Sequence, residues 1–349
     1  ILVRHEQAAV HAADGFSRAT GEVGTALVTS GPGATNAITG IATAFMDSIP
    51  MVVISGQVPL SKIGQDAFQE TDMVGVSRPI VKHSFLVTRA EDIAETIAKA
   101  YYIAATGRPG PVVVDIPKDV TDPSHKVPYH WPTEVKMRSY QPTDKGHRGQ
   151  IKRAVKTLIN AKRPVIYTGG GIVIDNASEQ LIALAKKLNY PVTNTLMGLG
   201  GYPGTDRQYV GMLGMHGTYE ANTAMHHSDV IFAVGARFDD RATGHLAQFA
   251  PSARIIHIDI DAAEISKLRK ADVAIVSELT PALEGIRLSR KVSATWCGQC
   301  AGWKKEFAWR YDAPEEGIYA PKLLRDLSRA KPEGMIVTCD VGQHQMWVA

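Results

Sequence analysis

The sequence predicts an α/β protein with two doubly wound, mostly parallel sheets, followed by the truncated start of a third α/β domain. Apolar runs alternate with helical patterns along the chain, which is the order typical of βαβ units. The runs are short and rich in β-branched residues, as at 51–54 and 112–114, and such runs suit strands buried on both faces of a parallel sheet. A polar segment without periodicity, 123–148, separates two such series and is interpreted as a linker.

The first domain, 1–122, and the second domain, 149–290, alternate strand and helix patterns. In the first, strands are expected at 1–3, 26–29, 51–55 and 112–114, and helices at 6–19 and 34–47. In the second, strands are expected at 164–168, 191–194, 230–234, 254–259 and 273–276, and helices at 151–161, 178–188 and 281–288.

The region 291–349 differs in composition, because it holds most of the Trp residues and many charged ones. A helix is expected at 321–330 and a last strand at 335–339. We interpret this region as a connector and the beginning of a third domain. Because both chain ends fall within apparent elements, we expect the chain to be an internal piece of a longer protein.

Composition excludes several classes of function. The chain has 349 residues, of which 44% are hydrophobic and 21% charged, so it can bury about two cores of ordinary size. The net charge of +3 is spread along the sequence, which predicts neither a nucleic-acid nor a membrane partner. No apolar run approaches the ~18 residues that span a bilayer, and a cytoplasmic protein is expected.

The cysteines suggest no framework and no metal site. Three cysteines do not make a disulfide scaffold in a chain of this length. Cys297 and Cys300 form a C-x-x-C pattern, but no second pair of ligands completes a tetrahedral zinc site. We therefore expect an incidental, exposed pair.

Glu6 stands where a predicted buried strand gives way to a helix, and strand ends are where open α/β sheets bind ligands. Burial would raise the pKa of its carboxyl, whereas Arg4 and a helix N-terminus would lower it, so the residues alone leave the direction open. The glycine-rich turn 29–36 can bring backbone N–H groups to an anion or a polar ring. A glutamate that only complements the helix dipole, and an ordinary tight turn, are the alternatives.

A second group of segments is typical of a nucleotide site. Three glycines at 169–171 follow a strand and match G-x-G-x-x-G in part, since Ile174 stands at the last glycine position. The segment 213–217 precedes a helix, and 235–241 follows a buried strand.

Charged residues strengthen this prediction. Arg237 and Arg241 offer planar donors to phosphates, and Asp259 and Asp261 end a strand where an acidic side chain can take ribose hydroxyls. Each segment could instead be a surface turn. Together they predict a nucleotide site.

These strings, with several others, resemble the family of acetolactate synthase (acetohydroxyacid synthase) large catalytic subunits over essentially the whole chain. The matching strings are R-H-E-Q at 4–7, T-S-G-P-G-A-T-N at 29–36, D-A-F-Q-E at 66–70, G-R-P-G-P-V-V-V-D-I-P-K-D at 107–119, L-G-M-H-G at 213–217, G-A-R-F-D-D-R at 235–241, H-I-D-I-D at 257–261 and D-V-G-Q-H-Q-M-W at 340–347. So many specific strings in the right order make chance agreement negligible.

The resemblance implies a transferase that uses thiamine diphosphate, FAD and Mg²⁺. Members of the family decarboxylate pyruvate and join the product to a second pyruvate or to 2-ketobutyrate, which is the first common step of valine, leucine and isoleucine biosynthesis. The flavin has no net redox part in this reaction. The resemblance further implies a homodimer of catalytic subunits with a small regulatory subunit.

It also implies roles for individual residues. The Glu that matches Glu6 hydrogen-bonds the aminopyrimidine ring of thiamine diphosphate and relays protons through the cofactor. The implied catalytic residues are Glu6, Phe68, Gln69 and Lys118. The implied cofactor-binding residues are Glu6, Pro32, Asn36, Arg108, Gly169, Gly170, Gly171, Thr195, Leu196, Met197, Met215, His216, Gly217, Gly235, Ala236, Arg237, Asp240, Arg241, Asp259, Ile260, Asp261, Glu278, Val341, Gly342, Gln343 and His344.

The chain departs from the family pattern in two respects. Ser277-Glu278 stands where relatives usually show Gly-Asp, although Glu keeps the carboxylate at the adenosine end of the flavin site. Neither Gly-Asp-Gly nor Asn-Asn, the two ends of the magnesium motif, occurs in the sequence, so the metal ligands are expected beyond residue 349. We therefore expect the 349-residue chain alone to be inactive.

Two other interpretations are considered. A pyruvate oxidase would use the same two cofactors, but the strings at 66–70 and 235–241 favour the synthase, and Glu6 disfavours a glyoxylate carboligase, which lacks this Glu. A non-catalytic nucleotide-binding module would keep the middle domain. The retention of Glu6 together with its glycine-rich turn argues against such a module.

Overall fold

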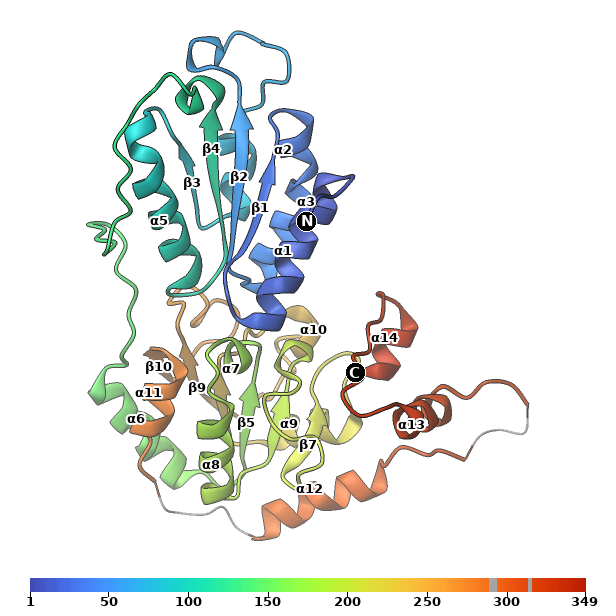
Figure 1. The fold of residues 1–349 in the computed structure, drawn as a ribbon. Helices are drawn as coiled ribbons and strands as arrows, with labels where there is room; N and C mark the ends of the chain where they lie inside the picture. The colour runs from blue at the N-terminus through green and yellow to red at the C-terminus, as the bar shows by residue number, and fades with distance from the viewer. Residues whose placement is uncertain (289–293, 313–315) are drawn as a thin grey trace. The chain divides into compact units, whose positions relative to one another are not determined.

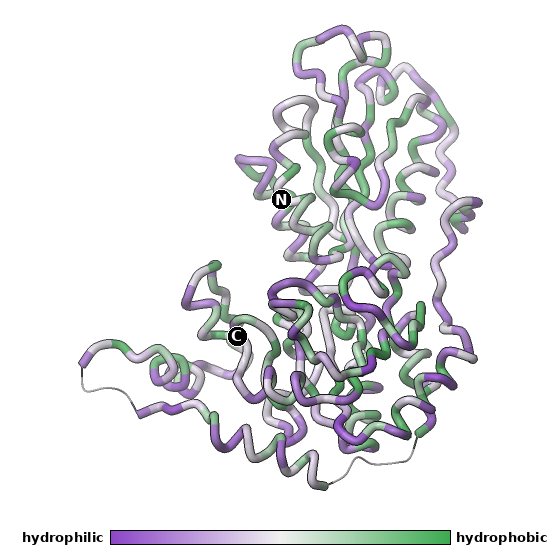
Figure 2. The backbone as a smooth tube through the Cα atoms, turned by 180° about the vertical axis from the view of Figure 1, so that it is seen from behind, coloured by the Kyte–Doolittle hydropathy of each residue, from purple (hydrophilic) through white to green (hydrophobic). Residues whose placement is uncertain are grey.

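The computed structural model describes residues 1–288, 294–312 and 316–349, which form two compact units, Ile1–Pro142 and Thr143–Ala349 (Figure 1). Each unit contains a parallel sheet with helices on both faces, so the predicted α/β class with two parallel sheets is confirmed. Figure 2 shows the segment that leads from one unit to the next as mostly hydrophilic. The expected domain limits stay predictions, and the limit at 290 lies outside the described residues.

The first unit is a sheet of four parallel strands in the order β1-β2-β4-β3. Its strands are β1 (Gly24–Val28), β2 (Met51–Gln57), β3 (His83–Leu86) and β4 (Pro111–Pro117). Its helices are α1 (Glu6–Thr20), α2 (Pro32–Asn36), α3 (Ile38–Asp47), α4 (Met73–Ser77) and α5 (Ile93–Ala105), with 3₁₀ turns at Leu60–Lys62, Arg78–Ile80, Ala90–Asp92 and Lys118–Thr121.

Helices cover both faces of this sheet, because alternate strand residues point to opposite sides. Met51 and Val53 of β2 pack in one buried cluster with residues of α1 and α3, whereas Val52 packs in another with residues of α5. In β4, Val113 faces the first cluster and Val112 the second. Burial on both faces explains why these strands read as continuous apolar runs.

The second unit has six parallel strands in the order β10-β9-β8-β5-β6-β7. Its strands are β5 (Pro164–Thr168), β6 (Val192–Asn194), β7 (Tyr209–Met212), β8 (Val230–Val234), β9 (Arg254–Asp259) and β10 (Val273–Val276). Its helices are α6 (Arg148–Asn160), α7 (Gly171–Ile174), α8 (Ser178–Leu188), α9 (Tyr219–His227), α10 (Asp240–Thr243), α11 (Leu279–Gly285), α12 (Ala294–Glu306), α13 (Ala320–Ala330) and α14 (Gln343–Val348), with a 3₁₀ turn at Leu196–Gly198. The chain leaves β5 toward β6 and later places β8 on the other side of β5, so the strand order reverses between β5 and β8.

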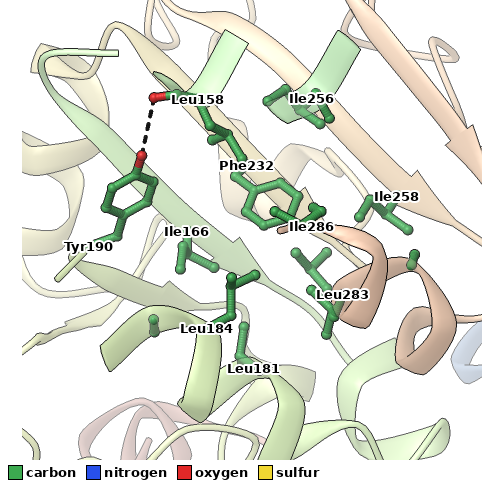
Figure 3. Packing of buried hydrophobic residues seen from close by; sticks show 14 of the residues in the cluster. Leu158, Ile166, Leu181, Leu184, Tyr190, Phe232, Ile256, Ile258, Leu283 and Ile286 are labelled. Atoms are coloured by element: carbon green, nitrogen blue, oxygen red, sulfur yellow. Dashed lines mark hydrogen bonds between the residues drawn. The ribbon is translucent and has the colours of Figure 1, made fainter. Parts of the chain in front are cut away.

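The larger core of this unit lies between the sheet and the helices α6, α8 and α11 (Figure 3). Phe232 of β8 is fully buried in this cluster together with Ile166 of β5. Tyr190 donates a hydrogen bond from its buried hydroxyl to the Leu158 carbonyl over 3.2 Å. Truncation of a buried Phe costs about 3–5 kcal/mol, so this cluster holds the strands, and therefore the loops after them, in fixed positions.

Two predicted strands are wrong. Residues 1–3 join no ladder among the described strands, and the side chains of Ile1 and Leu2 are fully exposed. Residues 335–339 are also outside the ladders of the described chain, and Ile336 is 88% exposed. A strand without a neighbour leaves its backbone groups unpaired and is not stable by itself.

Most other expected elements are present with shifts of a few residues, and 164–168, 178–188, 230–234, 254–259 and 273–276 have the expected bounds. The helix expected at 34–47 is two helices that meet at Ala37, and it begins at Pro32, whose missing N–H is harmless at a first helical position. Short strands such as β3 and β7 went unpredicted.

The C-x-x-C pair lies on α12, and its predicted exposure is wrong. Cys300 is 4% exposed in the cluster on the second face of the sheet, beside Trp296, whose Nε1 donates to the Pro164 carbonyl over 3.0 Å. Burial raises the pKa of Cys300 to about 12, so this thiol stays protonated and unreactive. Cys297 is half-buried and donates from its Sγ to the carbonyl of Asn189 over 3.1 Å. None of the helices in the described part of the chain has the length and apolar character that a bilayer crossing needs.

Candidate functional site

Glu6 is the first residue of α1 and is held from the side by Asn36. The helix packs through Val10 against the sheet, and its first turn is capped by His5, whose Nδ1 accepts from the N–H of Gln7 over 3.2 Å. The Glu6 carboxylate instead accepts at Oε2 a hydrogen bond from Nδ2 of Asn36 over 3.0 Å. This bond joins the start of α1 to the end of the glycine-rich turn.

The hydrogen bond from Asn36 is the main cause that holds the pKa of Glu6 below its ordinary value. A backbone hydrogen bond and the neighbouring His5 act in the same direction, and burial opposes them. The direction that the sequence left open is therefore downward. Glu6 is ionised at neutral pH and offers an acceptor to a ligand.

The glycine-rich turn brings backbone without side chains close to this carboxylate, and the space around Gly31 and Gly33 allows no other residue. Gly31 has a φ of 58°, and a Cβ there would lie 2.8 Å from the Cα of Gln69. At Gly33, a Cβ would meet Cγ2 of Thr29 at 2.6 Å and Oε1 of Glu6 at 3.3 Å. Any other residue at these positions would push the turn away from Glu6 or from Gln69.

The loop 64–70 folds back on itself through Glu70. Its carboxylate accepts hydrogen bonds from the N–H of Gly64 and, over 2.9 Å, from that of Ala67. Gln69 has a φ of 60° and packs through its backbone against Gly31. Phe68, next to it, is 88% exposed, so the structure brings Gln69 to the turn and leaves Phe68 in solvent.

The structure places the other expected residues of the first unit on three separate segments. Pro32 begins α2 and is exposed. Lys118 is exposed immediately after β4, at the same carboxyl edge of the sheet. Arg108 donates from its Nε to the Ser48 hydroxyl over 2.8 Å, at the end of α3.

Sequence reasoning missed a buried polar network below the loop 64–70. Asp115 of β4 accepts from the Ser55 hydroxyl over 2.6 Å and from Nε2 of Gln57 over 2.9 Å. Burial raises the pKa of Asp115, although these two hydrogen bonds oppose the rise. A signal was present, because Asp115 interrupts an otherwise apolar run.

In the second unit, the predicted nucleotide-binding segments meet at the carboxyl edge of one sheet. The glycines 169–171 follow β5, and 235–241 follows β8, its neighbour across the reversal of strand order. Open α/β sheets bind ligands at such a switch point, because the two loops diverge there.

The loops after β5 and β8 touch through backbone atoms. The N–H of Gly171 donates to the Gly235 carbonyl over 3.1 Å. A Cβ at Gly169 would lie 2.4 Å from that same carbonyl oxygen, and Gly235 itself has a φ of 55°. Tyr167, fully buried in β5, donates from its hydroxyl to the Arg237 carbonyl over 2.8 Å and so holds the second loop from below.

The turn after β6 lies against the first of these loops. Thr195 donates from its backbone N–H to the Thr168 carbonyl over 2.9 Å. A Cβ at Gly170 would meet the Cβ of Met197 at 3.2 Å. Leu196 and Met197 are 44% and 39% exposed, so their side chains face outward at this edge.

The segment after β7 lies against the segment after β8. The N–H of Met215 donates to the Arg241 carbonyl over 2.8 Å, and the Arg241 Nη1 lies 3.6 Å from the Met215 sulfur. Arg241 also approaches Asp240 at 3.6 Å. Both Arg241 and His216 are exposed and available to a ligand, whereas Ala236 is buried and Gly217 is packed against backbone.

Acidic residues also lie at this carboxyl edge, at the end of β9 and after β10. Asp259 accepts at Oδ1 from the N–H of Asp261 over 2.8 Å, across Ile260. Glu278 is exposed, and burial together with the carboxylates of Asp175 and Asp144 raises its pKa.

The last expected group stands at α14. Val341 and His344 are exposed, and Gly342 and Gln343 begin the helix. The side chain of Trp347 in this helix contacts Trp309, with ring centroids 5.7 Å apart. The structure brings the other groups of the second unit together at the sheet edge, and the role of these four residues stays a prediction.

Comparison with known families finds a match in each of the two units. Residues 1–76 match the N-terminal TPP-binding domain of thiamine pyrophosphate enzymes, and residues 151–286 match the central domain of the same enzymes. The chain belongs to the thiamine pyrophosphate enzymes. Within this family, it resembles acetolactate synthase large subunits over its whole length.

Three relatives of this thiamine pyrophosphate enzyme illustrate the resemblance. It is 57% identical to the acetolactate synthase isozyme 3 large subunit of Escherichia coli K12, covering 100% of this chain and 62% of that protein. It is 54% identical to the acetolactate synthase large subunit of Haemophilus influenzae, with 62% of that protein covered, and 44% identical to that of Corynebacterium glutamicum, with 57% covered. The chain thus spans less than two thirds of these relatives.

The residues of this thiamine pyrophosphate enzyme fit a thiamine ring in the first unit. Glu6 presents an ionised acceptor, and Gly33 lets the turn lie close to it, because a Cβ there would come within 3.3 Å of Oε1 of Glu6 and within 2.6 Å of Cγ2 of Thr29. In the second unit, the glycines after β5 and β8 let the two loops pack backbone against backbone at the switch point, which is where open α/β sheets bind ligands.

Proposed function

We propose that the protein to which this chain belongs is an acetolactate synthase, and that the chain carries the part of its large subunit that activates thiamine diphosphate. The reaction is decarboxylation of pyruvate followed by carbon–carbon bond formation with a second 2-keto acid, pyruvate or 2-ketobutyrate. The observation that carries the proposal is the Glu6–Asn36 pair beside Gly33, in a chain 57% identical to a relative of that name.

Glu6 is the proton-handling group of the proposed reaction. When bound, thiamine diphosphate supplies the carbon nucleophile and the electron acceptor for decarboxylation. The Glu6 carboxylate, kept ionised by Asn36, would accept a hydrogen bond from a protonated ring nitrogen of the cofactor and could take up and return that proton. Asn36 orients the carboxylate, and the absence of a side chain at Gly33 lets the glycine-rich turn lie close to it.

Phe68, Gln69 and Lys118 are proposed to complete the reaction centre. Gln69 is held against the turn at Gly31, and the exposed Phe68 and Lys118 lie on segments that follow the carboxyl ends of β2 and β4. An exposed aromatic ring on a loop is a surface that a small apolar group of a substrate can contact.

The second unit is proposed to bind FAD. Its glycines 169–171 and 235 would admit the phosphates to the backbone, Arg237 and Arg241 would pair with them, and the carboxylates at Asp259 and Glu278 would reach sugar hydroxyls. Arg108 is proposed to be a further cofactor-binding residue. The flavin is proposed to have no net redox part in the reaction.

Magnesium and the protein partners belong to the same proposal. The sequence contains neither Gly-Asp-Gly nor Asn-Asn, the two ends of the magnesium motif, so Mg²⁺ is proposed to be held by other residues of the protein. Val341, Gly342, Gln343 and His344 are proposed to approach the diphosphate. A homodimer, a small regulatory subunit, a cytoplasmic location and a role in branched-chain amino acid synthesis complete the proposal.

The test uses the protein expressed from the complete reading frame that contains this chain. With pyruvate, thiamine diphosphate, Mg²⁺ and FAD, we expect acetolactate and carbon dioxide in a ratio of one to one, while the flavin spectrum stays oxidised. Acetate as the main product, with steady reduction of the flavin and consumption of oxygen or a quinone, would instead identify a pyruvate oxidase. A protein that retains flavin but converts no 2-keto acid would favour the non-catalytic module.

A further inference from the structure

A buried chain of hydrogen bonds runs from the core of the first sheet to the loop that carries Phe68 and Gln69. Asp115 accepts at Oδ1 from the Ser55 hydroxyl over 2.6 Å and at Oδ2 from Nε2 of Gln57 over 2.9 Å. The same Nε2 donates to the Thr71 carbonyl over 2.6 Å. Thr71 directly follows the loop.

Every hydrogen-bonding group of the Gln57 amide has a partner. Its two Nε2 hydrogens go to Asp115 and to Thr71, and its Oε1 accepts from the N–H of Val58 over 2.9 Å. Exposure is 0% for Ser55, 1% for Asp115 and 7% for Gln57. If one of these hydrogen bonds is lost, water cannot easily take its place, and the buried polar group is left unpaired. The amide can keep all these partners in one orientation only.

The core of the sheet gives no reason for these polar groups. Val, Ile and Met fill most of the other positions of β2 and β4, and burial raises the pKa of Asp115, although its hydrogen bonds from Ser55 and Gln57 oppose the rise. A buried charged network is weak support for stability, because apolar residues of similar volume often do as well or better. Because stability does not call for this network, we look for its purpose where it ends, at the hydrogen bond from Gln57 that holds the Thr71 carbonyl in place.

From Thr71, the contacts continue to the proposed reaction centre. Glu70 closes the loop through the N–H groups of Gly64 and Ala67. Gln69, with a φ of 60°, packs its backbone against Gly31 so closely that a Cβ on Gly31 would lie 2.8 Å from its Cα. The turn that starts at Gly31 ends in Asn36, which binds Glu6.

We propose that Gln57 and Asp115 are positioning residues, which hold the loop 64–70 against the Gly31 turn through Thr71 and thereby set where Phe68 and Gln69 stand relative to Glu6. Ser55 orients the Asp115 carboxylate. The positional statement stands on these contacts alone, and only its catalytic consequence rests on the proposed function.

The decisive variant is Gln57→Glu, compared with Asp115→Asn. A carboxylate at 57 cannot donate to the Thr71 carbonyl and repels Asp115, so the loop loses its anchor. In Asp115→Asn, the amide oxygen accepts from Gln57 and the amide nitrogen donates to the Ser55 hydroxyl, so the bond to Thr71 is kept although the charge is gone. The double variant Gln57→Glu/Asp115→Asn restores a donor–acceptor pair between the strands, but it does not restore the donor to Thr71.

The experiment measures amide hydrogen exchange over residues 66–71 and, in the same protein from the complete reading frame, kcat and KM for pyruvate. We expect faster exchange in Gln57→Glu and in the double variant, a fall in kcat of about tenfold to 10²-fold in both, and values close to wild type in Asp115→Asn. If Gln57→Glu does not fold, Gln57→Met, which removes the same donors without adding a charge, takes its place.

Several outcomes would overturn the proposal. These are unchanged exchange at 66–71 in Gln57→Glu, normal kcat despite faster exchange, and full recovery in the double variant, since recovery would mean that only the pairing between strands matters. If the wild-type protein makes no acetolactate, the proposed function fails, while the exchange comparison still decides whether the network positions the loop.

Discussion

The two sheets present different kinds of surface at their carboxyl edges. In the first unit, the central feature is one side chain, the Glu6 carboxylate, whose orientation and pKa are set by a hydrogen bond from Asn36. In the second unit, the central feature is backbone, because Gly169 and Gly235 approach so closely that a Cβ has no room. Proton transfer needs a titratable group held in place, whereas binding a long nucleotide needs close approach of N–H groups.

This difference has a consequence for mutation. A partly exposed carboxylate contributes little to folding, so its loss should change the rate and leave the fold intact. A glycine packed against backbone at the second edge supports both the fold and the proposed cofactor binding, so its loss should lower stability and cofactor retention together. Variants of the protein from the complete reading frame can separate a loss of rate at the first edge from a loss of stability and cofactor at the second.

The largest effect is expected for Glu6→Gln. The amide keeps the shape of the side chain but cannot exchange the proton, so acetolactate formation should fall by about 10²-fold or more. The melting temperature should not change. Glu22→Gln, at an exposed glutamate of the same unit, serves as the control and should retain full turnover. Near-normal turnover in Glu6→Gln would show that another group handles the proton.

The next effect is expected for Gly235→Ala. The new Cβ would lie 2.8 Å from Cδ1 of Leu279 and 2.9 Å from the Cα of Gly171, at a φ of 55°. Denaturant unfolding should show a loss of about 1–3 kcal/mol, and purified protein should contain less flavin. The control Gly298→Ala lies in an exposed part of α12 with no atom within 4 Å of the new Cβ, and it should raise stability by about 0.5–1 kcal/mol. Equal behaviour of the two variants would contradict the cradle.

A smaller effect is expected for Tyr167→Phe. It removes the hydroxyl that holds the Arg237 carbonyl, which should cost about 0.5–1.5 kcal/mol and weaken flavin retention. Tyr190→Phe removes an equally buried hydroxyl from the Leu158 carbonyl, away from the edge. It should cost similar stability without affecting flavin content. A flavin titration of the two variants tests whether the position of the second loop matters.

The smallest effect is expected for Asn36→Ala. The pKa of Glu6 is lowered mainly by this amide, so its removal raises the pKa toward the ordinary value. The ionised form of Glu6 is then lost at a higher pH, and the acid side of the kcat/KM profile should move to higher pH, with little change on the basic side. An acid limb that stays in place would mean that ionisation of another group is observed.

Much of the carboxyl edge of the second sheet could be predicted from the sequence, because each strand and the loop after it can be recognised from neighbouring residues alone. Five elements of the second unit have the expected bounds, since each is a strongly apolar run or an amphipathic helix with clear ends. Gly169 and Gly235 could be predicted as part of candidate nucleotide-binding loops because they directly follow such runs. Val230–Val234 could be read as a buried strand without knowing which strand pairs with it.

What the sequence could not give depends on contacts between distant residues. The strand expected at 1–3 failed because no strand of the described chain pairs with it, and sequence shows no partner. The bond from Asn36 to Glu6 and the network around Asp115 each join positions thirty or more residues apart, so spacing says nothing about them. Cys300 was expected to be exposed as part of an incidental C-x-x-C pair, and its burial follows from the packing of α12, a helix that the sequence analysis did not predict.

The most direct test of the contrast between the two edges is a paired measurement of turnover and flavin content in Glu6→Gln and Gly235→Ala. We expect Glu6→Gln to keep the flavin content of the wild type and to lose about 10²-fold or more in acetolactate formation. We expect Gly235→Ala to lose flavin and stability, and its turnover to fall in proportion to the flavin lost. Loss of flavin in Glu6→Gln, or full retention of flavin in Gly235→Ala, would contradict the assignment of proton chemistry to the first edge and nucleotide binding to the second.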